Sequence, residues 1–362
     1  MSAPAPGRIN PRDDLRALEG YHSPQLDVSV RLNTNESPFP PPPGFVEQWV
    51  AALRAAPLNR YPDRAASRLR SALGRHLGQP AARVFCANGS NEVLQTLLLT
   101  YGGSGRRTVV FEPTYALHSH IARITGTEVV VGERGADFSI DADAALALVR
   151  ATKPAIVFVC SPNNPTGNVE ARETVTALVD AAPGLVVVDE AYGEFAPWSA
   201  LELVDDDLPL VVVRTYSKVW SMAALRLGFA VAPPWVIGEL EKVVLPYHLD
   251  VATQLAGELA LELRREMDER VTALVAERER VTTALSGIGG ITAYPSGANF
   301  VLVRVHGDGH TLWERLVEQG VLVRDFSRWP RLDDCLRITV GTRAENDALL
   351  TALRTCVQEV AA

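Results

Sequence analysis

Four short clusters of polar residues, each directly after an apolar run, carry the side chains best suited to chemistry. They are Glu112-Pro113-Thr114-Tyr115, Ser161-Pro162-Asn163-Asn164-Pro165, Asp189-Glu190-Ala191-Tyr192 and Thr215-Tyr216-Ser217-Lys218. The runs before them are rich in valine and alternate with helix-like stretches, a pattern typical of β-α-β units whose strands are covered on both faces. Ligands of open α/β sheets bind at the carboxyl ends of the strands, so we expect these clusters to face one cleft.

Lys218 is the candidate nucleophile. It follows a buried run, where desolvation lowers the pKa of an amine and favours its unprotonated form. Arg226, eight residues later, can return to the same pocket and hold a phosphate dianion together with Thr215 and Ser217. A lysine after a strand is common, so Lys218 alone does not establish a site.

Asp189 ends the apolar run 186–188, and a carboxylate at a buried strand end is costly unless a cation pairs with it. Tyr192, three residues later, is placed to donate a hydrogen bond to a ligand oxygen. The structural alternative is that Asp189 caps a following helix and Tyr192 packs in the core.

Two further strings indicate ligand contacts. In residues 161–167 two prolines and a glycine fix the backbone, which leaves one asparagine amide to point at a ligand. Asn88-Gly89-Ser90-Asn91-Glu92 indicates a capped helix start, whose free N–H groups suit a phosphate. Such caps are also common in helices that bind nothing.

These side chains match what pyridoxal 5′-phosphate (PLP) requires. The cofactor needs a lysine amine for its aldehyde, an acid opposite its ring nitrogen, a donor near its phenolic oxygen and a cradle for its phosphate. The four clusters and Arg226 supply each of these.

Taken together, the motifs resemble those of fold type I PLP-dependent aminotransferases of class I/II, and the histidinol-phosphate aminotransferase group is the most similar. Besides the strings above, the resemblance rests on Asn33-Thr34-Asn35-Glu36-Ser37-Pro38, Arg60-Tyr61-Pro62-Asp63, Leu225-Arg226-Leu227-Gly228, 320–324 and Leu336-Arg337-Ile338-Thr339-Val340-Gly341. It implies an α/β fold with a mostly parallel central sheet in a large domain and a smaller α+β domain. It also implies ping-pong amino transfer between L-histidinol phosphate and 2-oxoglutarate, a step of histidine biosynthesis, in a homodimer with a shared active site.

The resemblance assigns roles to individual residues. Lys218 would hold PLP as a Schiff base and carry the proton, Asp189 would pair with the pyridine nitrogen, and Asn164 and Tyr192 would contact the phenolic oxygen. Ser90, Asn91, Thr215, Ser217 and Arg226 would hold the cofactor phosphate. Tyr115 would lie against the ring, and Tyr61 would reach in from the neighbouring subunit.

On the substrate side the resemblance implies Tyr21, Tyr61, Asn164, Arg324 and Arg337. Arg324 and Arg337 match two arginines that receive the anionic end of the substrate. A pair of guanidinium groups suits a phosphate dianion, whereas one suits a carboxylate. The alternative for Arg324 is a surface ion pair with Asp325 or Asp333.

Two departures from the commonest family pattern bear on the pocket. Ser221-Met222-Ala223-Ala224-Leu225 replaces a more glycine-rich stretch, and His248 stands where asparagine is expected. Either change can reshape the pocket, although a local hydrogen bond at a helix start is the plainer interpretation of His248.

The expected organisation is an N-terminal arm (1–40) packing with the small domain or a dimer partner, a large PLP-binding domain (41–262) and a small C-terminal domain (263–362). Strands of the large domain are predicted at 107–111, 155–160, 184–189, 209–214 and 227–232. One long helix is predicted over 256–285, followed by strands at 299–305, 320–325 and 336–340 and helices at 311–319 and 344–357.

The composition limits the partners. The chain has 362 residues, 47% of them hydrophobic, and a formal net charge of -8 without a basic block, so we expect no nucleic-acid partner. There is no uninterrupted run of about 18 apolar residues, so we expect no membrane insertion.

Four scattered cysteines favour reduced thiols and a cytoplasmic location. His118 and His120 have no third ligand at metal spacing, so we predict no catalytic metal.

Three alternatives stay open. They are an aromatic amino-acid aminotransferase, a PLP-dependent lyase that decarboxylates a phosphorylated amino acid, and a non-catalytic PLP-binding regulator. No helix-turn-helix or basic stretch precedes residue 33, which argues against the regulator.

Overall fold

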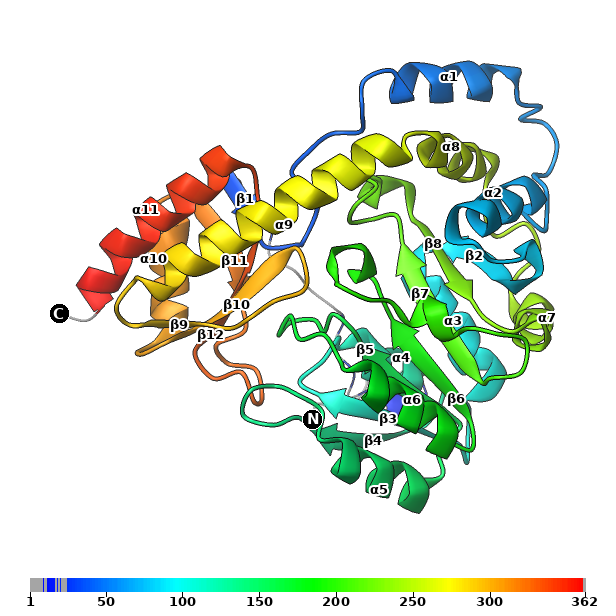
Figure 1. Ribbon diagram of the computed structural model, residues 1–362, viewed down its shortest axis with the longest axis horizontal. Helices are drawn as coiled ribbons and strands as arrows, with labels where there is room; N and C mark the ends of the chain where they lie inside the picture. Colours follow the sequence, from blue (N-terminus) through cyan, green and yellow to red (C-terminus); the bar gives the residue numbers. More distant parts are fainter. Residues whose placement is uncertain (1–8, 10–11, 17, 19, 21–24, 361–362) are drawn as a thin grey trace.

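The structure is a computed structural model that describes residues 9, 12–16, 18, 20 and 25–360. It contains two sheets joined by a long helix (Figure 1). The larger sheet has the strand order β2-β8-β7-β6-β5-β3-β4. Its strands are β2 (Val84–Asn88), β3 (Arg107–Glu112), β4 (Glu128–Glu133), β5 (Ile156–Cys160), β6 (Leu185–Asp189), β7 (Leu210–Thr215) and β8 (Leu227–Val231). Strand β8 runs antiparallel to both neighbours, and the pairs from β4 to β7 are parallel.

Both faces of the large sheet are covered, as the continuous valine runs predict. Along β6, Val186 and Val188 enter one hydrophobic core and Val187 enters another on the opposite face. The second core is closed by α3 (Gly89–Tyr101), α4 (Leu117–Ile124) and α7 (Pro234–Val243). The first is closed by α1 (Phe45–Ala55), α2 (Ser67–Leu77), α5 (Ala142–Thr152), α6 (Arg172–Ala181) and α8 (Val251–Glu262).

The smaller sheet has the order β1-β11-β12-β10-β9. Its strands are β1 (Val30–Leu32), β9 (Ile291–Ala293), β10 (Phe300–Val305), β11 (Val321–Asp325) and β12 (Cys335–Thr339), and it packs with α10 (Gly309–Glu318) and α11 (Arg343–Val360). Helix α9 (Arg264–Ser286) runs from the large sheet's helices to this sheet (Figure 1). Strand β1 pairs in parallel with β11 and therefore belongs to the small sheet. The chain after β1 leaves this sheet and reaches the large domain at α1, which packs on α8.

The α/β fold is confirmed, and the predicted strands match observed ones within two residues at each end. The single helix predicted over 256–285 is wrong, because α8 ends at Glu262 and α9 begins at Arg264. Leu263 between them has φ -98° and ψ 20°. The break follows from packing: α8 lies against α1 and α2, whereas α9 reaches β9, β10 and α11.

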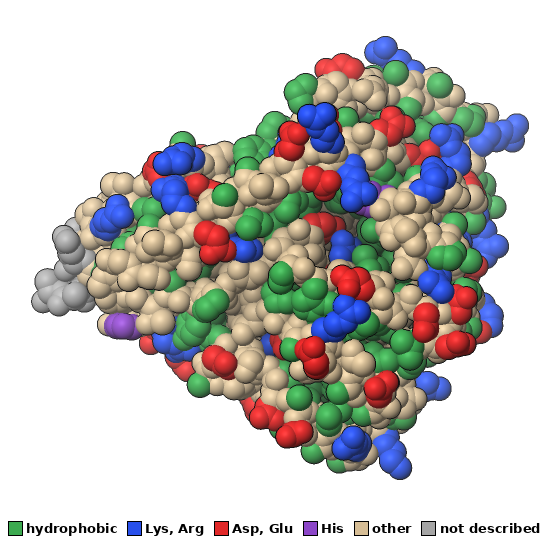
Figure 2. Space-filling view, viewed as in Figure 1, with side chains coloured by type: hydrophobic (Ala, Val, Ile, Leu, Met, Phe, Trp, Pro, Cys, Tyr) green, Lys and Arg blue, Asp and Glu red, His purple; other side chains and the backbone are tan. Residues whose placement is uncertain are grey.

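The described part of the chain has no helix long and apolar enough to cross a membrane. Acidic and basic side chains are interspersed over the face drawn in Figure 2. Within the same described residues, no group of three or more His, Cys, Asp or Glu side chains is arranged to hold a metal ion.

Candidate active site

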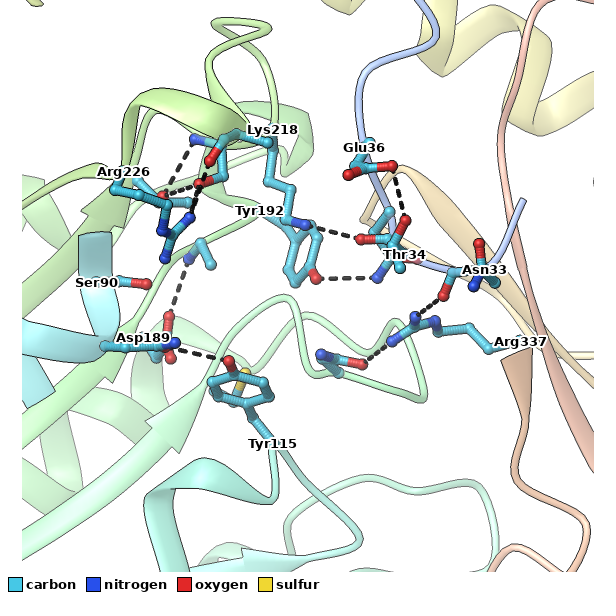
Figure 3. Close-up of a pocket in the computed structure, with 18 of the residues that line it drawn as sticks. Asn33, Thr34, Glu36, Ser90, Tyr115, Asp189, Tyr192, Lys218, Arg226 and Arg337 are labelled. Carbon is cyan, nitrogen blue, oxygen red and sulfur yellow. Dashed lines mark hydrogen bonds between the residues drawn. The ribbon is translucent and has the colours of Figure 1, made fainter. Parts of the chain in front are cut away.

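A cavity of about 370 Å³ lies at the carboxyl edge of the large sheet and extends to β12 of the small one (Figure 3). Eleven residues predicted from the sequence line it: Ser90, Asn91, Tyr115, Asn164, Asp189, Tyr192, Thr215, Ser217, Lys218, Arg226 and Arg337. The expectation that the strand-end clusters share one cleft is therefore met, because parallel strands deliver their carboxyl ends to one edge.

Lys218 is the lysine of this cavity. Its Nζ donates a hydrogen bond to the backbone oxygen of Thr34 at 3.0 Å. The pKa of Lys218 is lowered to about 7, chiefly by burial and also by the charges of Arg337 and Arg226, while the charge of Glu36 opposes the shift. An amine with that pKa is largely unprotonated just above neutral pH, which is the form that attacks a carbonyl.

Asp189 is held at the end of β6 with 1% of its surface exposed. A hydrogen bond of 2.9 Å joins its Oδ2 to His118 Nε2, and the Ala191 N–H donates to Oδ1 at 3.1 Å. The short 3₁₀ helix that follows starts at Gly193 with Tyr192 at its N-cap, so Asp189 does not cap it. A buried carboxylate at the cavity wall can pair with a cationic ring nitrogen.

His118 was considered in the sequence only as half of a metal pair, yet it orients Asp189. It is fully buried in α4 and stacks on Phe158, with ring centroids 4.7 Å apart. A signal did exist: His118 lies in the first turn of the helix that follows β3, at the same sheet edge as Asp189. Only the strand order, however, brings these two side chains together.

Tyr192 accepts a hydrogen bond at its Oη from Asn35 Nδ2 at 2.9 Å. Burial raises the pKa of Tyr192 to about 12, so its hydroxyl stays protonated and can donate to an anionic oxygen. The side chain is 4% exposed and lies on the same wall as Asp189.

The two asparagines of the 161–167 string have different roles. Asn163 binds only protein groups: its Oδ1 accepts from Thr114 Oγ1 at 2.7 Å, and its Nδ2 donates to Pro113 O at 3.0 Å. Asn164 lines the cavity, where its Oδ1 accepts from Arg337 at 2.5 Å. The prediction that one amide of this string is left for a ligand thus falls on Asn164.

A polar cradle closes one end of the cavity where α3 begins. Arg226 donates to Ser217 Oγ at 3.2 Å, and Thr215 Oγ1 donates to the same oxygen at 3.0 Å. A Cβ added to Gly228 would lie 2.2 Å from the backbone N of Ser90, and one added to Gly89 would lie 2.6 Å from an Nη of Arg226, so glycine at both positions allows the start of α3 to approach β8 and the guanidinium. Helix N–H groups, hydroxyls and an arginine form a donor set that fits a phosphate dianion.

Arg337 closes the opposite end from β12. It donates to Asn33 O at 2.7 Å. Arg324 is its partner residue on β11, and both guanidinium groups lie over Phe326, 5.5 Å and 5.7 Å from the ring centroid. Arg324 is 6% exposed, so it is not a surface residue, and it stands beside the cavity without lining it.

Two predicted site residues are not brought into this cavity. Tyr61 is 79% exposed and stacks on Tyr247, with ring centroids 4.3 Å apart. Tyr21 lies outside the described residues.

The two departures from the family pattern have separate outcomes. Ala223 and Ala224 line the cavity, so the 221–225 string does shape its wall. The His248 ring is bonded to Cys86 O of β2 at 2.9 Å and is not among the lining residues. The interpretation of His248 as making a local hydrogen bond is therefore wrong, because Cys86 lies 162 residues away in the sequence.

Residues 33–36, for which the sequence indicates no individual roles, form one wall of the cavity. Its backbone oxygens at Asn33 and Thr34 accept from Arg337 and Lys218. Backbone carbonyls are present at every residue, so side-chain types could not have indicated these contacts.

Comparison with known proteins gives consistent matches along the chain. The family model described as aminotransferase class I and II matches residues 28–353. The curated histidinol-phosphate aminotransferase of Mycobacterium avium (strain 104) is 47% identical over 351 residues, covering 94% of this chain and 87% of that protein. The one from Thermobifida fusca (strain YX) is 47% identical over 352 residues, covering 94% of this chain and 95% of that protein. The crystal structure of histidinol-phosphate aminotransferase from Sinorhizobium meliloti in complex with PLP has a TM-score of 0.84 and 27% identity, covering 92% of each chain.

Proposed function

The chain belongs to the class I and II aminotransferase family, and we infer that it is a PLP-dependent enzyme transferring the amino group of L-histidinol phosphate to 2-oxoglutarate in histidine biosynthesis. Relatives 47% identical over 94% of the chain are named histidinol-phosphate aminotransferases. One observation carries the proposal: a single cavity holds a lysine of lowered pKa between a phosphate cradle and a buried carboxylate at one end and Arg337 at the other.

The cavity fits the cofactor. The cradle at the start of α3 suits its phosphate, and Asp189 suits a protonated ring nitrogen, since a buried carboxylate needs a cationic partner. We propose that Asn164 and Tyr192 face the phenolic oxygen and that Tyr115 lies against the ring. When bound, PLP supplies an aldehyde that takes up the amino group and a ring that withdraws electrons from it.

The chain's own groups then bind, orient and move the proton. Because the pKa of Lys218 is about 7, its Nζ can accept a proton from the donor's carbon and return it as a general acid near neutral pH. His118 keeps Asp189 oriented through the 2.9 Å hydrogen bond. The hydroxyl of Tyr192 stays a donor, because its pKa of about 12 keeps the proton on the oxygen.

Two neighbouring arginines favour a phosphate ester over an amino-acid carboxylate. Arg337 lines the cavity, and Arg324 adds a second positive charge from the adjacent strand. One bidentate guanidinium satisfies a carboxylate monoanion, whereas a phosphate that is largely dianionic is better matched by two. This pair supports histidinol phosphate against an aromatic amino acid as the donor.

We further propose a homodimer in which Tyr61 enters the partner's cavity. Exposed apolar side chains support it: Leu58, Tyr61, Leu245 and Tyr247 are 72%, 79%, 76% and 41% exposed, and two of them stack on each other. We also propose a cytoplasmic location, which the four buried free thiols support because such thiols persist in reducing compartments.

Mixing two inactive variants tests whether each active site is shared between two subunits. Tyr61→Ala and Lys218→Ala are each expected to be nearly inactive. Equal mixing with subunit exchange gives heterodimers with one intact site, and about a quarter of the wild-type activity should return. A mixture as inactive as its components contradicts a site shared across the dimer.

The half-reaction tests the activity itself. PLP-loaded enzyme mixed with histidinol phosphate, without an acceptor, should convert its absorbance to that of the pyridoxamine form. Conversion with phenylalanine but not with histidinol phosphate would overturn the substrate, and release of carbon dioxide from a phosphorylated amino acid would indicate a lyase.

A further inference from the structure

Two acidic side chains line the cavity, and they differ in what they are free to do. Asp189 is buried and bonded to His118 and to a backbone N–H. Glu36 is exposed at the opening, where Thr34 Oγ1 donates to its Oε2 at 2.8 Å. Thr34 is the one hydrogen-bond donor to the Glu36 carboxylate among the described residues, so the second oxygen of this cavity-lining side chain is left for another donor.

Glu36 lies close to the groups that define the substrate's path. Thr34, two residues earlier, accepts the hydrogen bond from Lys218, and two residues of chain span at most about 7 Å. Its charge is felt at the lysine amine. Figure 3 shows Glu36 above the Lys218–Thr34 contact and Arg337 below it. The two side chains therefore lie on different sides of the reacting amine.

The donor has two arms on the carbon that bears its amino group. If Arg337 takes the phosphate arm, the imidazole arm is left to the side of Glu36. Imidazole keeps at least one N–H donor in both its neutral and its protonated form, and a carboxylate is an acceptor. A phenyl ring in the same place would desolvate the carboxylate without giving it a donor, which is penalised.

We propose that Glu36 accepts a hydrogen bond from the imidazole ring of the amino donor and thereby selects imidazole-bearing donors over aromatic ones. This rests on the proposed function, since it assumes that histidinol phosphate is the donor. Thr34 has a positioning role, because its hydroxyl holds one oxygen of the carboxylate and so leaves the other for the ligand.

The test is a substitution series at Glu36. Glu36→Leu removes the acceptor and Glu36→Gln keeps a neutral one. Glu36→Leu loses a hydrogen bond to a charged group, so its kcat/KM for histidinol phosphate should fall about 10- to 100-fold. The kcat/KM of Glu36→Gln should lie between those of Glu36→Leu and the wild type. With glutamate as the donor, kcat/KM should not fall in either variant. Glu47→Leu is the matched control, because Glu47 is exposed on α1 outside the cavity.

Binding gives a readout that needs no turnover. The dissociation constants of 3-(imidazol-4-yl)propyl phosphate and of propyl phosphate are measured by calorimetry on the PLP-loaded enzyme. Glu36→Leu should weaken only the imidazole compound, by about tenfold or more.

Three results would overturn the inference, and they can be told apart from one another. Unchanged selectivity in both Glu36 variants removes the imidazole contact while the proposed function stands. An equal loss with glutamate means that Glu36 acts through Lys218 and not on the ring. A wild-type enzyme that does not convert histidinol phosphate overturns the proposed function, and this inference with it.

Discussion

Replacing Asp189 by asparagine separates its charge from its hydrogen bonds. The side chain is 1% exposed and contacts His118 Nε2 and the Ala191 N–H. An amide oxygen still accepts from Ala191, and the amide N–H can donate to His118 if the imidazole presents its unprotonated nitrogen. The geometry is therefore largely kept and the negative charge is lost.

The expected effect follows from burial. Removing one partner of a buried ion pair costs about 3–5 kcal/mol, so the pairing with a protonated ring nitrogen should weaken by that amount. At about 1.4 kcal/mol per tenfold, the first half-reaction should slow roughly 100- to 5000-fold. The free energy of unfolding of the cofactor-free protein should change by only about 1 kcal/mol, the net worth of one hydrogen bond.

Stopped-flow conversion of the PLP form to the pyridoxamine form, in a single turnover, measures this rate. Glu190→Gln is the control: Glu190 is the neighbouring buried acid, but it pairs with Arg214 and Ser199. Glu190→Gln should lower stability with little change in the half-reaction. A half-reaction in Asp189→Asn within about fivefold of wild type would refute the assignment of Asp189 to the ring nitrogen.

Four further predictions concern Lys218, the phosphate cradle and the anion site. In cofactor-free enzyme the pKa of Lys218 is lowered from 10.5 to about 7, so the rate of PLP capture should rise with pH, reach half its maximum near pH 7 and level off within about two pH units above that. A rate still rising at pH 10 would contradict it. The folded chain then binds fewer protons than the unfolded chain between pH 7 and 10.5, so Lys218 makes stability rise with pH across that window in chemical denaturation. Gly228→Ala places a Cβ 2.2 Å from Ser90 N and should weaken PLP binding at least about tenfold in a fluorescence titration, whereas Gly238→Ala, with open space around it, should not. Arg337→Lys loses the planar fork and should raise KM for histidinol phosphate about tenfold or more in steady-state assays, and an unchanged KM would place the phosphate elsewhere.

The sequence predicted the interior strands and missed the edges. Strands β1, β2, β4 and β9 are the outermost strands of their sheets, and none was predicted. An interior strand of a covered sheet must be apolar throughout, as β6 is, whereas an edge strand pairs on one side only. Strand β4 shows this, because most of its residues are partly or fully exposed. Strand β2 is also an edge strand, but four of its five residues are buried, so exposure does not explain why it was missed.

In the candidate site, the residues at strand ends were predictable and the long-range contacts were not. Lys218, Asp189 and Asn164 were predictable because each follows an apolar strand, and parallel strands end at one edge. The contact of His118 with Asp189 spans 71 residues and depends on the strand order. The contact of Lys218 with Thr34 spans 184 residues and ends on a backbone oxygen, which no residue type indicates.

Chemical trapping of the cofactor on its lysine tests the central claim most directly. The chain has three lysines, and Lys153 and Lys242 are both exposed, away from the cavity that Lys218 lines. Borohydride reduction of the PLP-loaded enzyme, followed by peptide mass mapping, should place the phosphopyridoxyl group on Lys218, and Lys218→Ala should abolish the label. A label on Lys153 or Lys242, or one that persists in Lys218→Ala, would contradict the assignment on which the proposed function depends.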